Sequence, residues 1–249
     1  MSTKKPLGLI TFDVDDTLYP TSEFVRHARE ASLRAMMVAG LKVDFSTAMS
    51  ELNEVVQEFS SNDEQHFDRL LVRLPPACLD GINPAVLIAA GVAAYHDTVY
   101  GRLAAYEDVL QCVKSLYEKG YRMGAISQGW TVKQAQKLVR LRILPFLDKR
   151  AIFLSDQVGM SKSNPKYYQR VAENMSLPPE RCMHIGDRPD RDIDPANQAG
   201  WITVLNRRSG HYHERVGITP PAFTVHNFWD LAELIEKKFE PATQHGCAT

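Results

Sequence analysis

Between Thr21 and Gly101, apolar residues recur at steps of three and four positions. This spacing places them on one face of an α-helix. The successive faces comprise Phe24, Ala28, Ala31, Ala35 and Val38, then Ala48, Leu52, Val55 and Phe59, then Phe67, Leu70, Leu71 and Leu74. Gly40 and Pro75 fit helix ends, and Pro84 fits the first turn of a fourth helix. The pattern predicts a small all-helical unit.

After Gly101 the pattern changes to short apolar runs that alternate with amphipathic helices. The predicted strands are 122–127, 151–154, 182–185 and 202–205, and the predicted helices are one that ends at Gly120 and those at 132–141, 167–175 and 195–199. Strands that alternate with helices are typical of a parallel sheet with right-handed crossovers. A further apolar run, Leu7–Phe12, precedes the helical unit.

The chain is therefore predicted to be an α/β protein whose helical unit is inserted after the first strand. Residues 1–19 and 102–239 form the sheet domain in this prediction, and residues 20–101 form the helical insertion. The last ten residues, EPATQHGCAT, have no periodicity, so residues 240–249 are predicted to be a disordered tail.

Composition excludes several classes of protein. With 24% charged residues and a formal net charge of −1, the chain has no excess of basic residues that would attract nucleic acid or anionic lipid. No apolar run approaches the about 20 residues of a membrane-spanning helix, and the start MSTKKPLGLITF lacks a signal-peptide cleavage pattern. The four cysteines form no CxxC pair, which indicates neither a zinc site nor a disulfide framework. We expect a cytoplasmic protein.

Acidic residues follow the first predicted strand directly. The run LITF ends in Asp13, Asp15 and Asp16, where like charges repel each other. Further polar residues near the ends of later strands are Ser127, Lys162, Asp187 and Asp192. Ligands bind outside the carboxyl ends of the strands in an open parallel sheet, so we expect these side chains to share one site.

These residue types suit phosphoryl transfer to water through a covalent intermediate. The Asp13 carboxylate can attack phosphorus, and Asp15 can protonate the departing alkoxide and later activate water. A hard cation with oxygen ligands, such as Mg2+, would offset the repulsion between the two acids, and Asp187 offers it a third oxygen ligand. Lys162 would balance the charge of the phosphate and of Asp13, while Ser127 would bind a phosphate oxygen.

The chain closely resembles the haloacid dehalogenase-like hydrolase superfamily in four motifs, which are FDVDDTL, the apolar run that ends in Ser127, the segment around Lys162, and GDRPDRD. The helical insertion resembles the helical cap of the phosphoglycolate-phosphatase-like subfamily. The stretches HFDRLLVRL and AYHDT are similar to those of archaeal glyceraldehyde-3-phosphate phosphatases. The resemblance covers Leu7 to about Phe239 and implies a Rossmann-like core with an inserted helical cap.

The resemblance also implies a role for each candidate residue. These roles are nucleophile for Asp13, acid and base for Asp15, phosphate binder for Ser127, and catalytic lysine for Lys162. In the family, the residues that match Asp13 and Asp187 bind Mg2+ through their side chains, and the residue that matches Asp15 binds it through its backbone carbonyl. Asp192 is expected to support the site by holding Lys162.

Two residues depart from the family pattern. Gln128 follows Ser127 where Asp or Asn is commoner, and Ser163 follows Lys162 where Pro is usual. Asp15 separates the branches of the family, because a dehalogenase expels halide without a proton and lacks an acid at this position. The presence of Asp15 favours a phosphatase or a phosphomutase.

Structural and calcium-binding interpretations compete with this one. FDVDDTL could be a solvated acidic turn, but the preceding apolar strand and the three partner motifs favour a site. An EF-hand loop that begins at Asp13 would need Gly at its sixth position and Glu at its twelfth, where Leu18 and Phe24 stand. His211 and His213 have the spacing of metal ligands, but the absence of a visible third ligand disfavours a zinc site there.

The sequence as a whole predicts a Mg2+-dependent phosphatase that forms an aspartyl-phosphate at Asp13. Its expected partner is a small phosphorylated metabolite, such as glyceraldehyde 3-phosphate or a phosphoglycolate-like compound. One alternative is a sugar phosphomutase, which passes the phosphoryl group to a second hydroxyl group instead of water. Another is a non-catalytic binding module with a phosphorylatable aspartate.

Overall fold

A computed structural model describes residues 4–59, 63–208 and 214–242 of the chain. The chain divides into two compact units, of which one comprises Ser22–Leu103 and the other Met1–Thr21 and Ala104–Thr249. The predicted insertion, residues 20–101, differs from the first unit by two residues at each boundary. No helix in the described ranges is long and apolar enough to span a membrane.

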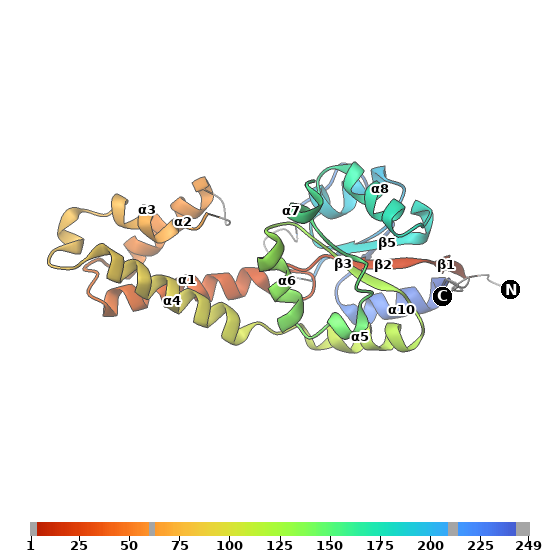
Figure 1. Cartoon of the computed structure of the whole chain (residues 1–249), viewed down its shortest axis with the longest axis horizontal. Helices are drawn as coiled ribbons and strands as arrows, with labels where there is room; N and C mark the ends of the chain where they lie inside the picture. The colour runs from red at the N-terminus through yellow and green to blue at the C-terminus, as the bar shows by residue number, and fades with distance from the viewer. Residues whose placement is uncertain (1–3, 60–62, 209–213, 243–249) are drawn as a thin grey trace. The chain divides into compact units, whose positions relative to one another are not determined.

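The larger unit is built on a parallel sheet (Figure 1). Within the described ranges, six strands form this sheet in the order β4-β3-β2-β5-β6-β7, and all neighbouring pairs are parallel. The strands are β2 (Leu9–Phe12), β3 (Met123–Ser127), β4 (Ile152–Leu154), β5 (Cys182–Gly186), β6 (Ile202–Asn206) and β7 (Phe223–Val225). The parallel sheet predicted from the alternation of strands and helices is confirmed.

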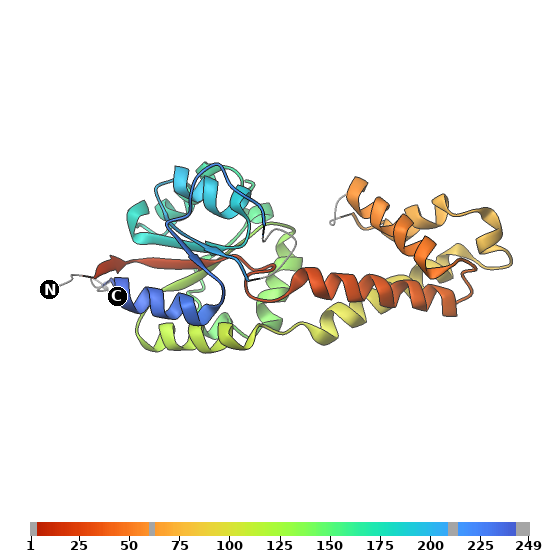
Figure 2. The same ribbon diagram turned by 180° about the vertical axis from the view of Figure 1, so that it is seen from behind.

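Helices cover both faces of this sheet. They are α5 (Glu107–Glu118), α6 (Thr131–Arg140), α7 (Ser155–Val158), α8 (Pro165–Asn174), α9 (Asp194–Gln198) and α10 (Phe228–Lys238), with short turns η2 (Leu144–Phe146), η3 (Pro179–Arg181) and the π-helical η4 (Pro189–Ile193). Helices α5 and α10 lie side by side on one face, and α8 lies on the other (Figures 1 and 2). Residues of β2 are buried on both faces, which explains the uninterrupted apolar run LITF.

The smaller unit contains the helices α1 (Thr21–Val38), α2 (Phe45–Phe59), α3 (His66–Arg73) and α4 (Pro84–Arg102), with a short turn η1 (Pro76–Leu79). Its core is formed by the apolar faces of these helices, including Leu33, Met36, Leu52, Phe67, Leu70 and Leu87. The third predicted apolar face, which begins at Phe67, therefore packs inward with the others. An amphipathic helix must pack in this way in order to bury its apolar stripe. The inserted helical unit of the predicted fold is confirmed.

Two local predictions are corrected. The run Leu7–Phe12 is not one strand, because β1 (Lys5–Leu7) pairs with β8 (Phe239–Pro241) in a separate two-stranded sheet and β2 begins at Leu9. The predicted tail at 240–249 is wrong for Glu240 and Pro241, whose backbone belongs to β8. Apolar periodicity does not reveal a strand whose order comes from a distant partner. Residues 243–249, and His211 with His213, lie outside the described residues.

Candidate active site

The carboxyl ends of three adjacent strands bring the first candidate residues together. Asp13 follows β2, Ser127 is the last residue of β3, and Asp187 follows β5. In the sheet, β2 lies between β3 and β5, and its Phe12 pairs with both Ala125 and Ile185. Parallel strands end at the same edge of the sheet, so local sequence alone is enough to place these three residues at one edge.

Lys162 reaches this edge from the loop before α8. Its Nζ atom lies 2.5 Å from Oδ1 of Asp13 and 2.5 Å from Oδ1 of Asp192, and it also donates to the carbonyl oxygen of Ile126 at 3.2 Å. Lys162 is 1% exposed, and a buried ammonium group requires such partners. Burial alone would lower the pKa of Lys162, but Asp13 and Asp192 raise it, so the side chain stays charged.

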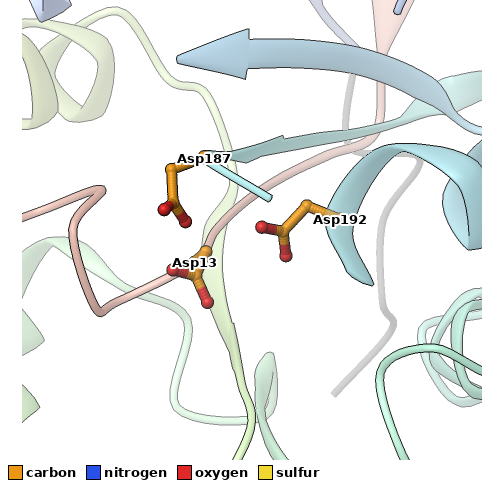
Figure 3. A group of neighbouring side chains, drawn as sticks. All are labelled: Asp13, Asp187 and Asp192. Carbon is orange, nitrogen blue, oxygen red and sulfur yellow. The ribbon is translucent and has the colours of Figure 1, made fainter. Parts of the chain in front are cut away.

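Asp13, Asp187 and Asp192 form a cluster of buried carboxylates. Each offers an oxygen atom that lies within 4.8 Å of the other two. The Asp187 side chain points toward Asp13 from the adjacent strand end, and Asp192 points toward both from η4 (Figure 3). Carboxylate oxygens in this arrangement are the donor set of a hard divalent cation. The cluster could therefore hold a metal ion.

The electrostatics of the cluster show where positive charge is lacking. Burial raises the pKa of Asp13 to about 7, despite the opposing effect of Lys162. Burial and the neighbouring Asp13 raise the pKa of Asp187 to about 9. Burial alone would also raise the pKa of Asp192, but Lys162 and His184 hold it well below its usual range. Lys162 thus compensates Asp192 well, whereas Asp13 and Asp187 would both be stabilised as carboxylates by a cation between them.

The carboxylate of Asp15 does not belong to this cluster. It accepts hydrogen bonds from Lys137, Tyr19 and Thr21, and the Nζ of Lys137 lies 2.6 Å from Oδ1 and 2.7 Å from Oδ2. Although burial alone would raise the pKa of Asp15, these donors lower it. The predicted metal set of Asp13, Asp15 and Asp187 therefore differs from the three clustered carboxylates. The family resemblance implied that Asp15 contacts the metal only through its backbone carbonyl, so its side chain remains available to pair with Lys137.

Comparison with known proteins identifies the family to which the chain belongs. The model of the haloacid dehalogenase-like hydrolase family matches residues 7–200. The chain belongs to the haloacid dehalogenase-like hydrolase family. Among solved structures, a haloacid dehalogenase-like family hydrolase from Xanthomonas campestris superposes with a TM-score of 0.69 at 19% identity, covering 94% of this chain and 96% of that one. This likeness extends the fold assignment to nearly the whole chain.

Curated relatives of this hydrolase are more similar to it in sequence than the solved structure is. A glyceraldehyde 3-phosphate phosphatase of Methanopyrus kandleri is 43% identical over 208 residues, covering 82% of this chain and 85% of that protein. The enzyme of the same name from Methanocaldococcus jannaschii is 34% identical over 227 residues, covering 91% and 96%. The sequence-based prediction of an enzyme of this family, in its phosphatase class, is confirmed by these relatives.

The two departures from the family motifs lie in one hydrogen-bond network. Oε1 of Gln128 accepts from the backbone N–H of Lys162 at 2.8 Å and from the hydroxyl of Ser161 at 3.3 Å. The hydroxyl groups of Ser161 and Ser163 are 2.8 Å apart, and the N–H of Ser163 donates to Oγ of Ser161 at 3.3 Å. Gln128 therefore fixes the backbone at Lys162, in a loop that lacks the usual proline.

Ser127 and Asp192 are each held by a residue that the sequence analysis did not single out. The Ser127 hydroxyl donates to Oε1 of Gln134 at 3.1 Å. His184, which is fully buried, lies with Nε2 3.2 Å from Oδ1 of Asp192 and Nδ1 2.9 Å from the Thr11 hydroxyl. Burial lowers the pKa of His184, so the neutral ring with a proton on Nε2 fits these partners.

Sequence patterns contain little signal for these supporting residues. Gln134, Lys137 and His184 lie within ordinary helix and strand patterns, and their partners come from other elements. Lys137 and Asp15 are separated by 122 positions in the sequence. A contact of this kind depends on how α6 packs beside the end of β2, and no local spacing encodes it.

Proposed function

We propose that this hydrolase is a Mg2+-dependent phosphatase that cleaves a small phosphomonoester through an aspartyl-phosphate at Asp13. The observation that carries the proposal is the position of Asp13 at the end of β2, with Lys162 at 2.5 Å and the Asp187 carboxylate facing it (Figure 3). A buried carboxylate with one cationic partner and space for a metal ion has the charge balance that attack on an anionic phosphate needs.

Asp13 and Asp187 would hold Mg2+, which when bound would offset the charge of the phosphate and of the attacking carboxylate. The donor set fits this cation, because both side chains are buried carboxylates and no side chain in the described ranges donates a hydrogen bond to the carboxylate of Asp187. Lys162 would contribute a second positive charge next to Asp13.

Hydrolysis would proceed in two displacements at phosphorus. In the first, an oxygen of Asp13 bonds to phosphorus, the bond to the ester oxygen breaks, and Asp15 gives its proton to the departing alkoxide. The acid step needs protonated Asp15, and an anionic phosphate close to the carboxyl group favours that form. In the second, Asp15 takes a proton from water, whose oxygen attacks phosphorus and releases Asp13. When substrate binds, the Ser127 hydroxyl would turn from Oε1 of Gln134 and donate its hydrogen bond to the transferred phosphoryl group.

Glyceraldehyde 3-phosphate is the first substrate to test, because two relatives that share much of their length with this chain carry that name. We further propose that the helical unit, Ser22–Leu103, acts as the cap that selects the substrate. A short phosphorylated metabolite with a terminal phosphate group suits nucleophilic attack by a buried aspartate, since its ester oxygen can reach Asp15 without the burial of a large leaving group.

The test is release of inorganic phosphate from a panel of small phosphomonoesters, with and without Mg2+. Wild type is compared with Asp13→Asn, which keeps the size of the side chain but removes the nucleophile. Glu173→Gln, at an exposed position of α8, is the matched control. Metal-dependent release that Asp13→Asn loses and Glu173→Gln keeps is the expected result. Undiminished release by Asp13→Asn would overturn the mechanism. Accumulation of a substrate isomer with no release of inorganic phosphate would indicate the phosphomutase.

A further inference from the structure

The Asp15 carboxylate is held by donors from two segments of the chain. Tyr19, just after the turn that follows Asp15, donates to Oδ1 at 2.6 Å, and Thr21, the first residue of α1, donates to the same oxygen at 2.8 Å. Lys137 comes from α6, and its Nζ contacts both Oδ1 and Oδ2. In the described part of the chain, Lys137 is the only side chain that donates hydrogen bonds to both oxygens of this carboxylate.

The two oxygens of Asp15 are therefore not equivalent. A carboxylate has about four lone-pair sites, two on each oxygen. Oδ1 receives three donors and is saturated, whereas Oδ2 receives Lys137 alone. Oδ2 keeps the capacity to exchange a proton with a leaving group or with water. Its direction is set by Lys137, because Tyr19 and Thr21 fix only Oδ1.

We propose that Lys137 is a positioning residue that aims Oδ2 of Asp15 at the group that gains or loses a proton. This inference rests on the proposed function, in which Asp15 is the acid and base.

The location of Lys137 supports a role beyond a surface ion pair. An exposed pair contributes about 0–1 kcal/mol, largely because solvent and side-chain motion compete with it. The side chain of Lys137 is only 12% exposed, and its Nζ lies 6.0 Å from the centre of the Tyr19 ring. Lys137 thus has little freedom to leave the carboxylate.

Helix α6 is itself anchored to the site. Gln134, one turn before Lys137, accepts the hydrogen bond of Ser127 at 3.1 Å and donates to the carbonyl oxygen of Gln128 at 3.1 Å. The first residue of the helix, Thr131, donates to Asp156 through its backbone N–H and its hydroxyl. Residues three positions apart lie on one helix face. The same face of α6 therefore supports both Ser127, through Gln134, and Asp15, through Lys137.

The experiment compares two leaving groups in the Lys137→Met variant with Mg2+ present. Glyceraldehyde 3-phosphate has an alkoxide leaving group that needs a proton, whereas 4-nitrophenyl phosphate has a leaving group that departs without one. The ratio of kcat/KM for the two substrates is measured, because kcat/KM covers steps up to departure of the leaving group. This ratio does not depend on the fraction of enzyme that is folded.

General acid catalysis contributes about 10²–10⁴-fold, so loss of the orientation of Asp15 should lower kcat/KM for glyceraldehyde 3-phosphate at least about tenfold. The value for 4-nitrophenyl phosphate should fall by no more than about threefold, since its chemistry bypasses the acid. Lys137→Arg should restore the ratio, because guanidinium can also contact both oxygens. Lys133→Met, one turn earlier on α6 at an exposed position, is the matched control and should leave both values unchanged.

An equal fall for both substrates in Lys137→Met, or no fall for either, would overturn the positioning role. If Lys137→Met does not fold, Lys137→Gln, which is similar in length and polar, replaces it under the same criterion. The proposed function is judged separately, by phosphate release from wild type and its loss in Asp13→Asn. A wild type that hydrolyses both substrates with an unchanged ratio in the Lys137 variants refutes only the role of Lys137.

Discussion

Gly186, the last residue of β5, lies where the site has no room for a side chain. A Cβ atom at this position would lie 2.5 Å from Cβ of Asp192, and closer still to Cγ and Oδ2 of the same residue. Ordinary contacts between such atoms are about 3.5–4.0 Å, so Gly186→Ala requires Asp192 to move by about 1 Å. The clash involves the base of the side chain, which a change of rotamer cannot remove.

Asp192 cannot make this movement without losing its partners. Its carboxylate contacts Nζ of Lys162 at 2.5 Å, the backbone N–H of Arg188 at 2.9 Å and Nε2 of His184 at 3.2 Å. A shift of about 1 Å takes most of these contacts beyond hydrogen-bond range. Overpacking costs about 1–3 kcal/mol and a hydrogen bond to a charged group contributes about 1.5–3 kcal/mol. With partial relaxation, we expect Gly186→Ala to lower the free energy of unfolding by about 3 kcal/mol.

Thermal unfolding and phosphate release test this expectation together. For a chain of this size, about 3 kcal/mol corresponds to a fall in Tm of about 6–12 °C. Misplacement of Lys162 should also lower kcat at least about tenfold. Gly101→Ala is the control, because nothing lies within 4 Å of a Cβ at that position in α4, and it should change stability by no more than about 1 kcal/mol.

A double-mutant cycle isolates the cause. If contact with Asp192 produces the effect, Asp192→Ala should cost less stability in the Gly186→Ala background than in wild type. Wild-type Tm and kcat in Gly186→Ala would refute the reasoning. Equal costs of Asp192→Ala in the two backgrounds would show that the strain lies elsewhere.

Three further predictions concern the charge, backbone and loops of the site. The pKa values of about 7 for Asp13 and about 9 for Asp187 lie above the usual carboxyl value of about 4, so the folded metal-free protein binds protons more tightly than the unfolded chain. The stability of the metal-free protein should therefore fall as pH rises from about 4 to about 9. Mg2+ should raise Tm more at pH 9 than at pH 5, and an increase in Tm that does not change with pH would contradict this expectation. Asp16 has a φ of 58°, so Asp16→Ala should be less stable in thermal melts than Asp16→Gly by about 1 kcal/mol, and the reverse order would count against the strain. Gln128→Ala removes the acceptor for the Lys162 backbone N–H and should lower kcat about fivefold, whereas Gln128→Glu keeps an acceptor and should lose less; equal losses would exclude this role of the acceptor.

The sequence by itself identified the sheet edge and the residues that lie there. Apolar runs of four or five residues encode buried parallel strands, because each strand is covered on both faces. The polar residue that follows such a run must emerge at the carboxyl edge, so Asp13, Ser127 and Asp187 could be placed without coordinates. The helical insertion was equally visible, because a spacing of three and four is a property of each helix alone.

The contacts among these residues were decided by the tertiary structure. Asp13 and Asp15 are two positions apart, yet one faces Asp187 and Lys162 while the other is held by Lys137. The parallel pairing of β1 with β8 likewise joins segments from the two ends of the chain. Local patterns follow from the geometry of a single element. The direction of a buried carboxylate depends instead on which cation the packing of distant elements brings within about 3 Å, because unpaired charge is costly inside a protein.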